Sequence, residues 1–260
     1  MKVLITSGGT KIPIDRVRSI TNMSRGTFGS RIADAFFDEG LKAFRAGNER
    51  GNPIEKITFF MAKGSRRPAL QALNDETYED GYRPIEYVEY STFDDYKSGV
   101  EELLKKEKYD VIVAAAAVSD YGVANYYDGK YRSREDDMCI RLVKLPKVLP
   151  EIRALAPDAV LCGFKLLVDS TEDELLNAME KQIDETNVDL VVGNDLRDIK
   201  ADDHKLLVMR NERINSSESV YAYRKYRQPP KAERTAKTEA ALADAVRDEC
   251  LAAYGRKAKP

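Results

Sequence analysis

The sequence predicts an α/β fold: a Rossmann-like, doubly wound and mostly parallel sheet with helices on both faces. Short apolar runs that suit buried strands alternate with segments whose apolar residues recur every three or four positions. In addition, residues 109–117 form a nearly unbroken apolar run, which is typical of a central parallel strand covered on both faces. We expect one domain over residues 1–260, with a small C-terminal strand and helix extension.

Strands are expected where short apolar runs are bounded by polar or turn-forming residues. The runs "KVLIT", "KITFFMA" and "IEYVEY" come first, and "AVLCGF" and "VDLVVG" follow the central run. In chain order the predicted strands are 2–6, 56–62, 85–90, 109–117, 159–164 and 188–193, with two more near 205–209 and 219–223.

Helices are expected between these strands because apolar residues repeat at helical spacing. Gly40 is the stop signal of the first helix, and Thr92 is a candidate N-cap of the second. Thr171 and Glu174 form the Thr-x-x-Glu pattern of a capping box. The expected apolar faces are Phe28, Ile32, Ala35 and Phe36 in 24–40, Phe93, Tyr96, Val100 and Leu103 in 92–107, and Leu175, Met179 and Ile183 in 171–185; two further helices cover 146–157 and about 234–254.

Two segments break this alternation. Residues 43–56 are a polar insertion that we expect to be a surface loop without a role of its own. Residues 122–138 are long, polar and rich in Tyr and Gly. Loops of this length in compact domains often act as lids, so we predict a mobile active-site loop there. The basic segment 223–231 has no assigned role.

Composition excludes several classes of protein. A net charge of −2 argues against a nucleic-acid binder, which usually has a basic excess. No apolar run approaches the roughly 20 residues of a membrane helix. The opening "MKVLIT" is too short for a signal peptide, so a cytoplasmic enzyme is expected. The cluster "GSRRP" at 64–68 could contact an anion, although most such clusters are solvated surface, which is the expectation here.

Cysteine and histidine are scarce. The chain has three cysteines, Cys139, Cys162 and Cys250, far apart in sequence, and the single histidine His204. This excludes a Cys/His zinc site and argues against a disulfide framework. We interpret the three cysteines as buried small apolar residues.

The most informative stretch is "ITSGGTKIPIDRVRSITNMSRGTFG", residues 5–29. It matches neither the dinucleotide fingerprint nor the P-loop pattern. Its glycines and hydroxyls nevertheless precede a predicted helix, where backbone N–H groups bind anions. The alternative is a purely structural loop. The candidate phosphate-binding residues are Gly8, Gly9, Ser24, Gly26 and Gly29.

Three other segments are expected at the same carboxyl edge of the sheet. Small residues at Ala114, Ala115 and Ala116 would let a ligand approach closely, and Asp120 could hold a metal ion or a ribose, or cap a helix. Lys130 is a cation on the long loop that could reach a phosphate, although exposed surface is its default. Phe164 could stack on a flat ring and Asn194 could contact its polar edge, or they could be core and turn residues.

Together these segments resemble the phosphopantothenate–cysteine ligase family of coenzyme A biosynthesis. The matching motifs are the opening stretch, "AAAAVSDY", "DGKYRS", "LVKLPKVL", "GFKLLVDSTEDELL" and "DLVVGNDLRDIKADDHKLLV", and they cover about residues 1–210 in the family's order. The resemblance leads us to expect the free-standing bacterial form, because these motifs begin at the first residues of the sequence without a decarboxylase segment before them.

The resemblance implies a two-step reaction. The carboxylate of 4'-phosphopantothenate attacks the α-phosphate of CTP or ATP and releases pyrophosphate, leaving an acyl-nucleotidylate. The amine of L-cysteine then attacks the acyl carbon and expels the nucleoside monophosphate. Activation as a mixed anhydride divides one hard step into two easier ones. Mg²⁺ is expected to bridge the triphosphate, with no metal site built by the protein alone.

The resemblance also implies roles for individual residues. Asn22 holds the acyl-nucleotidylate, Lys130 neutralises phosphates, and Arg18 reaches the phosphopantothenate phosphate across the interface of a homodimer. The segment with Ala116 and Asp120 lines the nucleotide and substrate sites. The nucleotide contacts carried over from the family are Ala114, Ala115, Pro146, Lys147, Val148, Leu149, Phe164 and Asn194.

Some residues depart from the family pattern. Bifunctional bacterial members carry nucleotide-contacting lysines on the helix before "VDLVVG", where this chain has Gln182 and Thr186. The bacterial members suggest CTP as the nucleotide, and this departure from their lysines leaves ATP as the alternative. Arg25 adds a charge within the Gly-rich loop. The competing functions are an NADPH-dependent oxidoreductase, suggested by Lys63 and Arg66 after the second strand, and a non-catalytic binding protein with the same fold.

Overall fold

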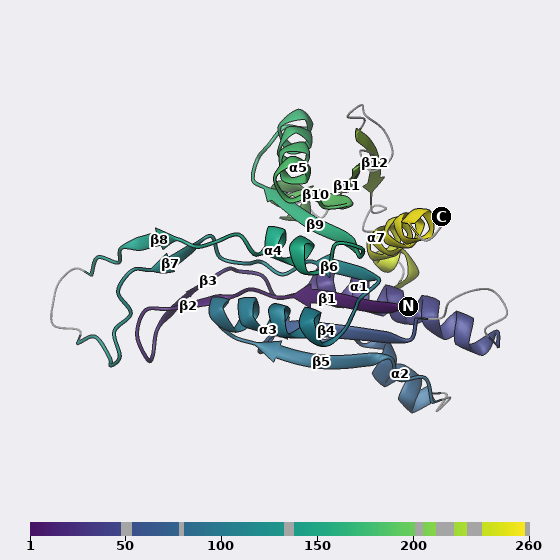
Figure 1. The fold of residues 1–260 in the computed structure, drawn as a ribbon, viewed down its shortest axis with the longest axis horizontal. Helices are drawn as coiled ribbons and strands as arrows, with labels where there is room; N and C mark the ends of the chain where they lie inside the picture. Colours follow the sequence, from purple (N-terminus) through teal and green to yellow (C-terminus); the bar gives the residue numbers. More distant parts are fainter. Residues whose placement is uncertain are drawn as a thin grey trace.

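The computed structural model describes residues 1–47, 54–77, 81–132, 138–200, 205–211, 221–227 and 236–257 (Figure 1). An eight-stranded sheet lies at its centre, in the order β12-β11-β10-β9-β6-β1-β4-β5. Neighbouring strands from β5 to β10 are parallel, whereas β11 and β12 pair antiparallel at one edge. The strands are β1 (Lys2–Ser7), β4 (Lys56–Ala62), β5 (Ile85–Tyr90), β6 (Val111–Ala114), β9 (Val160–Leu167), β10 (Leu190–Asp195), β11 (Lys205–Asn211) and β12 (Tyr221–Arg227).

Helices cover both faces of this sheet, which confirms the predicted fold class. The two faces have separate cores, and β1 shows why. Val3 and Ile5 point into the core beneath α1 and α7, while Leu4 points into the core beneath α3, α4 and α5. The described helices are α1 (Thr27–Arg45), α2 (Leu70–Thr77), α3 (Phe93–Lys106), α4 (Val148–Leu155), α5 (Glu172–Thr186), α6 (Leu196–Lys200) and α7 (Ala236–Lys257).

Capping fixes where two helices begin, as the sequence predicts. The Thr92 hydroxyl accepts a hydrogen bond from the N–H of Asp95, whose carboxylate accepts one from Thr92. Thr171 and Glu174 form the same reciprocal pair at the start of α5. The apolar faces also agree, except that Leu104 is buried in α3 where Leu103 was expected.

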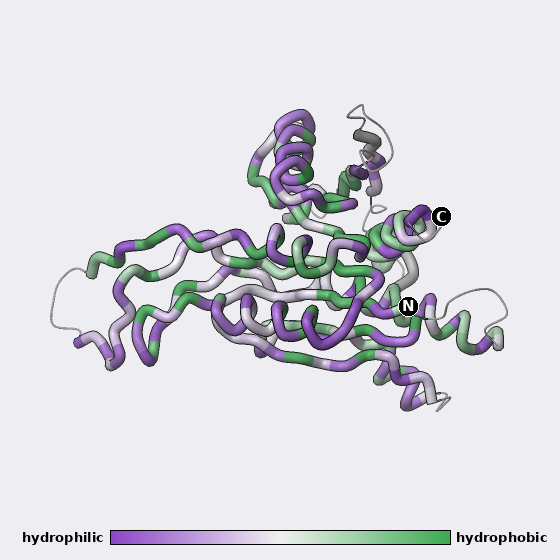
Figure 2. Tube along the Cα trace, in the orientation of Figure 1, coloured by the Kyte–Doolittle hydropathy of each residue, from purple (hydrophilic) through white to green (hydrophobic). Residues whose placement is uncertain are grey.

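Two hairpins extend from the carboxyl edge of the sheet to form a long projection (Figure 1). One joins β2 (Lys11–Pro13) to β3 (Ser19–Thr21), and the other contains β7 (Tyr121–Val123) and β8 (Leu142–Lys144). The N–H of Tyr127 donates to the carbonyl of Ile14, which holds the hairpins together at 3.2 Å. We call residues 11–23, 121–132 and 138–144 the arm. Figure 2 shows apolar residues along it as well as along the sheet.

Gly40 is not a helix stop, contrary to the sequence-based prediction, because α1 continues to Arg45. The glycine is needed for packing instead. A Cβ placed on Gly40 would lie 1.9 Å from the Tyr82 hydroxyl oxygen and 3.0 Å from the Cβ of Ile54.

The surface insertion predicted over residues 43–56 is wrong at both of its bounds. Residues 43–45 belong to α1 and Ile54 is buried, while residues 48–53 lie outside the described part of the chain.

Replacing Gly40 with Ala is expected to lower the free energy of unfolding by about 1–3 kcal/mol, because the added methyl group overpacks a closed site. Gly255 in α7 is the matched control, since a Cβ there meets nothing within 4 Å. Gly255→Ala should raise stability by about 0.5–1 kcal/mol through helix propensity. Urea denaturation of both variants tests this, and equal effects would contradict the packing argument.

Several predicted boundaries and burials also need correction. The central strand is shorter than the predicted 109–117, because β6 ends at Ala114 and the chain continues as a loop. Asn194 and Asp195 end β10 and are not a turn. Cys162 and Cys250 are buried as expected, but Cys139 on the arm is exposed. Helices α2 and α6 were not predicted, and His204 lies outside the described residues.

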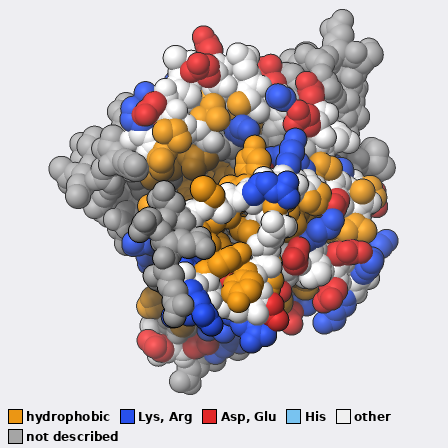
Figure 3. Space-filling view, turned by 90° about the vertical axis from the view of Figure 1, so that its left-hand side faces the viewer, with side chains coloured by type: hydrophobic (Ala, Val, Ile, Leu, Met, Phe, Trp, Pro, Cys, Tyr) orange, Lys and Arg blue, Asp and Glu red, His pale blue; other side chains and the backbone are white. Residues whose placement is uncertain are grey.

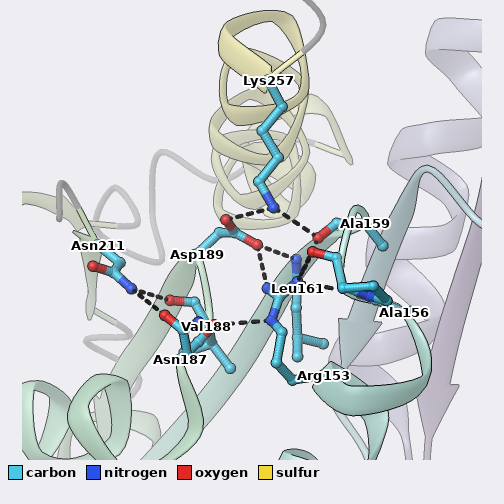
Figure 4. Close-up of polar contacts among 10 residues, drawn as sticks. Arg153, Ala156, Ala159, Leu161, Asn187, Val188, Asp189, Asn211 and Lys257 are labelled. Carbon is cyan, nitrogen blue, oxygen red and sulfur yellow. Dashed lines mark hydrogen bonds and ion pairs between the residues drawn. The ribbon is translucent and has the colours of Figure 1, made fainter. Parts of the chain in front are cut away.

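A buried polar cluster joins three elements at the opposite edge of the sheet (Figure 4). Asp189 accepts hydrogen bonds from Arg153 at 2.5 Å and from the backbone N–H of Leu161 at 2.8 Å, and it pairs with Lys257 at 2.8 Å. Arg153 also donates to the carbonyl oxygens of Asn187, Ala156, Pro157 and Ala159. Lys257 donates to Ala159 too, so the end of α7 is tied to α4 and to the strands.

Candidate active site

The Gly-rich loop is built on close contacts between β1 and the start of α1. Gly26 is the N-cap of α1 with φ of 72°, a left-handed conformation that favours glycine. The Ser7 hydroxyl donates to the Gly26 carbonyl at 3.1 Å. A Cβ on Gly29 would lie 2.4 Å from the Ser7 Oγ. These contacts hold the helix N-terminus close to β1, and no side chain caps it.

Gly8 and Gly9 join this loop to the loop after β6. Gly8 has φ of +87°, and its carbonyl accepts the N–H of Ala117 at 2.8 Å. The carbonyl of Ala117 accepts in turn from Thr10 N–H. Ala116 N–H donates to the Thr6 hydroxyl oxygen at 3.2 Å. The structure therefore brings the two predicted segments into direct contact, with Ala114 at the end of β6 and Ala115 half-buried beside them.

Asn22 reaches the same place from the arm. Its side-chain amide donates to the carbonyl of Ala117 at 2.7 Å, and its own carbonyl lies beside Gly9. Ser24 is close by, because its hydroxyl oxygen accepts the N–H of Gly26 at 3.4 Å. Asn22 is exposed, so its amide is available to a ligand that displaces this bond.

Asp120 and Lys147 form an exposed ion pair at the mouth of the site, with 2.5 Å between the carboxylate and the ammonium. Lys147 is the N-cap of α4, and Pro146 precedes it. Val148 is buried, and Leu149 lies half-buried beside Gly163. The segment 146–149 thus continues the wall of the site from β6 toward β9.

Phe164 lies in the carboxyl half of β9, and Asn194 is the next-to-last residue of β10, the neighbouring parallel strand. Phe164 is half-buried and makes an edge-on contact with Phe28 of α1, with 6.1 Å between ring centroids. Val192 pairs with Phe164 across the ladder, two residues before Asn194. A Cβ on Gly163 would lie 2.5 Å from the amide nitrogen of Gln182, so that side chain lies over β9 at Gly163. Thr186 instead donates its hydroxyl to the Gln182 carbonyl.

Lys130 and Arg18 lie in the arm. The side chain of Lys130 is exposed and has no ion-pair partner among the residues that the structure describes. Arg18 pairs with the buried carboxylate of Asp15 at 2.9 Å and donates to the carbonyl of Tyr131 at 2.8 Å. The backbone on either side of Lys130 is anchored, because Gly129 accepts from Arg16 N–H and Tyr131 donates to Asp15. Residues 133–137 of the predicted mobile loop lie outside the described chain.

Two buried carboxylates hold the backbone around the site. Burial opposes ionisation of Asp195, but hydrogen bonds from Ser170, Arg197 and Asp169 outweigh it and lower its pKa from 3.8 to about 2. At Asp15, burial is likewise outweighed by hydrogen bonds from Val17, Arg18 and Tyr131, and the pKa falls to about 2. Asp15 thus fixes the turn that carries Arg18, and Asp195 fixes the backbone of residues 169–170 and 197 next to Asn194.

Stability is expected to fall as the pH is lowered from about 4 to about 2. Both carboxyls have a lower pKa in the folded chain than in the unfolded chain, so their contribution is complete above 3.8 and is lost below it. Asp195→Asn should destabilise the protein at pH 7 and flatten this dependence. Urea denaturation at several pH values measures it, and an unchanged slope in the variant would contradict this assignment. Exposed Asp173→Asn is the control.

Figure 3 views the molecule from the side toward which the arm points. Apolar side chains line a hollow in this face, with Lys and Arg side chains around it. A flat apolar group and a phosphate chain could therefore lie side by side here. The predicted segments that follow β1 and β6 or lie on β9 and β10 are at this edge of the sheet, and Lys130 and Arg18 lie on the arm that extends from it.

A comparison with protein families shows to which family the chain belongs. Residues 1–45 and 78–228 match the family described as DNA/pantothenate metabolism flavoprotein C-terminal domain. The chain belongs to this family. The match includes the Gly-rich loop, the segment after β6 and the strands with Phe164 and Asn194.

Curated relatives and solved structures agree with this family. The coenzyme A biosynthesis bifunctional protein CoaBC of Thermococcus kodakarensis is 31% identical over 208 residues, which are 80% of this chain and 44% of that protein. The human phosphopantothenate–cysteine ligase is 27% identical, over 74% of this chain and 71% of that protein. This chain thus spans less than half the length of the bifunctional relative.

The fold is shared with the crystal structure of the DNA/pantothenate metabolism flavoprotein from Streptococcus pneumoniae. The TM-score is 0.71 at 24% identity, covering 97% of this chain and 99% of that one. This likeness supports the sheet order and the helical layers. Among the described residues, no helix is long and apolar enough to cross a membrane.

One residue beside the candidate site was not among the site residues predicted from the sequence. Ser65, in the turn after β4, lies against both Gly8 and Gly26. The charge of its segment predicts solvated surface instead. Only the tertiary structure shows that the serine in the middle of this charged run faces inward.

Proposed function

We propose that this chain is a phosphopantothenate–cysteine ligase that acts through an acyl-nucleotidylate. The observation that carries the proposal is the meeting of Asn22 with the loops after β1 and β6, at the uncapped start of α1. Helix N-terminal N–H groups suit a phosphate, and a neighbouring amide suits an oxygen that gains negative charge. The names of the relatives support the same reaction class.

In the first step, a carboxylate oxygen of 4'-phosphopantothenate attacks the α-phosphorus, and the bond to the pyrophosphate oxygen breaks. Exposed Lys130 on the anchored part of the arm supplies positive charge for this step. In the second step, the cysteine amine attacks the acyl carbon, and the nucleoside monophosphate leaves with the electron pair. The Asn22 amide donates to the oxygen that becomes negative.

The base of the nucleotide is proposed to lie over Phe164. This ring is half-buried and is braced by Phe28, so one face can stack on a pyrimidine. Gln182 of α5 instead lies over Gly163, whose side-chain direction is toward the sheet face opposite to the Phe164 ring. The Thr186 hydroxyl donates a hydrogen bond to the backbone carbonyl of Gln182 within α5. CTP remains our first choice because of the family resemblance alone, and ATP is the alternative.

Mg²⁺ fits this donor set only as a partner of the substrate. Among the described residues there is no group of three acidic, Cys or His side chains that could hold a metal alone. Asp120 is one carboxylate at the mouth of the site. Bound mainly by the triphosphate, the ion would neutralise phosphate charge, and Asp120 would be its candidate protein ligand.

The test is pyrophosphate release with phosphopantothenate, L-cysteine and Mg²⁺, run separately with CTP and with ATP. Release with CTP alone would support the ligase and cytosine selection. Release with ATP would retain the ligase and change the nucleotide. No release with either would reject the proposal. Titration with NADPH tests the oxidoreductase alternative, because binding would alter the fluorescence of the reduced cofactor.

We further propose that the arm pairs two copies of the chain. Several apolar side chains on it are exposed, and Met23 is 98% exposed. A soluble monomer rarely leaves so many apolar side chains open on one projection. A partner copy would cover them and bring its own Arg18 near this site. The exposed apolar residues of the arm are Val17, Ile20, Met23, Tyr121, Tyr126, Tyr127, Met138, Leu142 and Val143.

Sedimentation at micromolar concentration should therefore give about twice the chain mass of 29.3 kDa. Leu142→Asp should shift the protein to the single-chain mass by placing a charge in the covered surface. Leu155→Asp is the control, since Leu155 is similarly exposed but lies at the end of α4. A wild-type chain that sediments as a monomer would reject the proposed pairing.

A further inference from the structure

The turn after β4 places positive charge next to the Gly-rich loop. Ala62 ends β4, and residues 63–67 lead to α2. The turn is tied to the loop by a hydrogen bond of 2.9 Å from Arg66 N–H to the carbonyl of Arg25. We call Arg25, Lys63, Ser65 and Arg66 the basic turn.

The charged side chains of the basic turn form no ion pair within the described part of the chain. Arg25, Lys63 and Arg66 are all exposed, and none makes an ion pair among the residues that the structure describes. Arg66 acts on the Asp34 carboxylate only through its charge, because Asp34 accepts hydrogen bonds from the N–H groups of Ala69 and Leu70. Arg67 differs, because it pairs with Glu89 at 3.0 Å and lies 5.1 Å from the Tyr87 ring centroid.

Ser65 gives a second, independent sign of a ligand. Its Oγ is buried and has no hydrogen-bond partner within the described structure. An unsatisfied buried hydroxyl costs free energy, so such groups are rare unless they serve a ligand. A Cβ on Gly8 would lie 3.0 Å from this oxygen, and one on Gly26 would lie 3.1 Å from the Ser65 Cβ. The hydroxyl therefore lies at the anion-binding loop itself.

The order of the strands gives the direction of the ligand. Phe164 lies on β9, the Gly-rich loop follows β1, and the basic turn follows β4. In the sheet, β6 and β1 lie between β9 and β4. A nucleotide with its base over Phe164 and its α-phosphate at the start of α1 would extend its remaining phosphates toward β4.

We propose that the basic turn binds the pyrophosphate portion of the nucleotide, its β- and γ-phosphates. This inference rests on the proposed ligase function. When the substrate carboxylate forms its bond to the α-phosphorus, the bond to the bridging oxygen breaks and that oxygen retains the electron pair. The three cations and the Ser65 hydroxyl stabilise the charge that develops on the leaving pyrophosphate.

Isothermal titration with inorganic pyrophosphate, with and without Mg²⁺, tests the inference without turnover. Arg66→Gln and Lys63→Gln should each weaken binding about tenfold, as expected for a lost charge-assisted hydrogen bond. Arg67→Gln is the matched control: it removes the same charge from the same turn, but from a side chain that is already paired. It should leave affinity within about twofold, and equal weakening in all three would overturn the inference by showing a general charge effect.

Ser65→Ala separates binding from structure. The variant should weaken pyrophosphate binding several-fold without lowering the unfolding temperature, because it removes a hydroxyl that has no partner within the described structure. A fall in stability with unchanged affinity would show a structural role and overturn the assignment of Ser65.

Steady-state kinetics shows whether the basic turn binds a phosphate of the nucleotide or the phosphate of phosphopantothenate. Arg66→Gln should raise the KM for the nucleoside triphosphate and leave that for phosphopantothenate unchanged. A rise only for phosphopantothenate would overturn the inference while retaining the ligase. Conversely, pyrophosphate binding that depends on Arg66 in a protein without ligase activity would support this anion site and reject the proposed function.

Discussion

Asn22→Ala is expected to lower the kcat of amide formation by about 10²–10³-fold, the usual loss when one donor to a developing oxyanion is removed. The side chain is exposed and its single described bond, to the Ala117 carbonyl, ties two loops at the edge of the site. Loss of the amide should therefore affect catalysis much more than folding. The measurement is pyrophosphate release and product formation at saturating substrates, together with the unfolding temperature.

Asn177→Ala is the matched control for this variant. Asn177 is an exposed asparagine on α5, away from the predicted site residues, and alanine suits a helix there. Its turnover should equal that of the unsubstituted protein. If Asn22→Ala also turned over normally, the assignment of Asn22 to the oxyanion would be wrong, and a binding-only role for the chain would gain support.

Arg153→Leu is expected to have the largest effect on stability, lowering the free energy of unfolding by about 3–5 kcal/mol. The guanidinium is largely buried and donates to four backbone carbonyl oxygens as well as to Asp189. Without it, Asp189 would keep only Lys257 and one backbone N–H. Leucine restores apolar volume but none of these hydrogen bonds.

Lys257→Met should cost less, because Arg153 continues to pair with Asp189 and Lys257 lies at the end of α7. Chemical denaturation of both variants compares them. Equal losses would mean that the ammonium, and with it the docking of α7, contributes as much as the guanidinium. Arg197→Leu, an exposed arginine on α6, should change stability by less than about 0.5 kcal/mol.

The sequence predicted the sheet and its covering helices because alternation of strand and helix patterns is a strong local signal. The capping boxes at Thr92 and Thr171 were equally readable, since each pattern lies within four residues. Gly40 misled the prediction because glycine ends helices and also permits close packing, and only the position of Tyr82 distinguishes the two. The arm was missed because its hairpins have short strands and exposed apolar residues, unlike core strands.

Part of the site was predictable because some of its residues belong to motifs that can be recognised locally in the sequence. Gly26 and Ala116 belong to motifs that are contiguous in the sequence, and the fold brings these motifs together. Ser65 belongs to no motif, and its proximity to Gly8 depends on the parallel pairing of β1 with β4. The identity of the nucleotide also could not be predicted, because Gln182 and Thr186 stand where relatives have lysines, and Gln182 lies over Gly163 and not beside the Phe164 ring.

The exposure of Cys139 on the arm makes the natural chain suitable for selective chemical labelling. The other two cysteines, Cys162 and Cys250, are fully buried, so a maleimide dye should attach at one position without any engineered substitution. If two arms cover each other, the rate of this attachment should fall as protein concentration rises. The thiol thus serves as a built-in reporter of assembly that can be followed by absorbance in a cuvette.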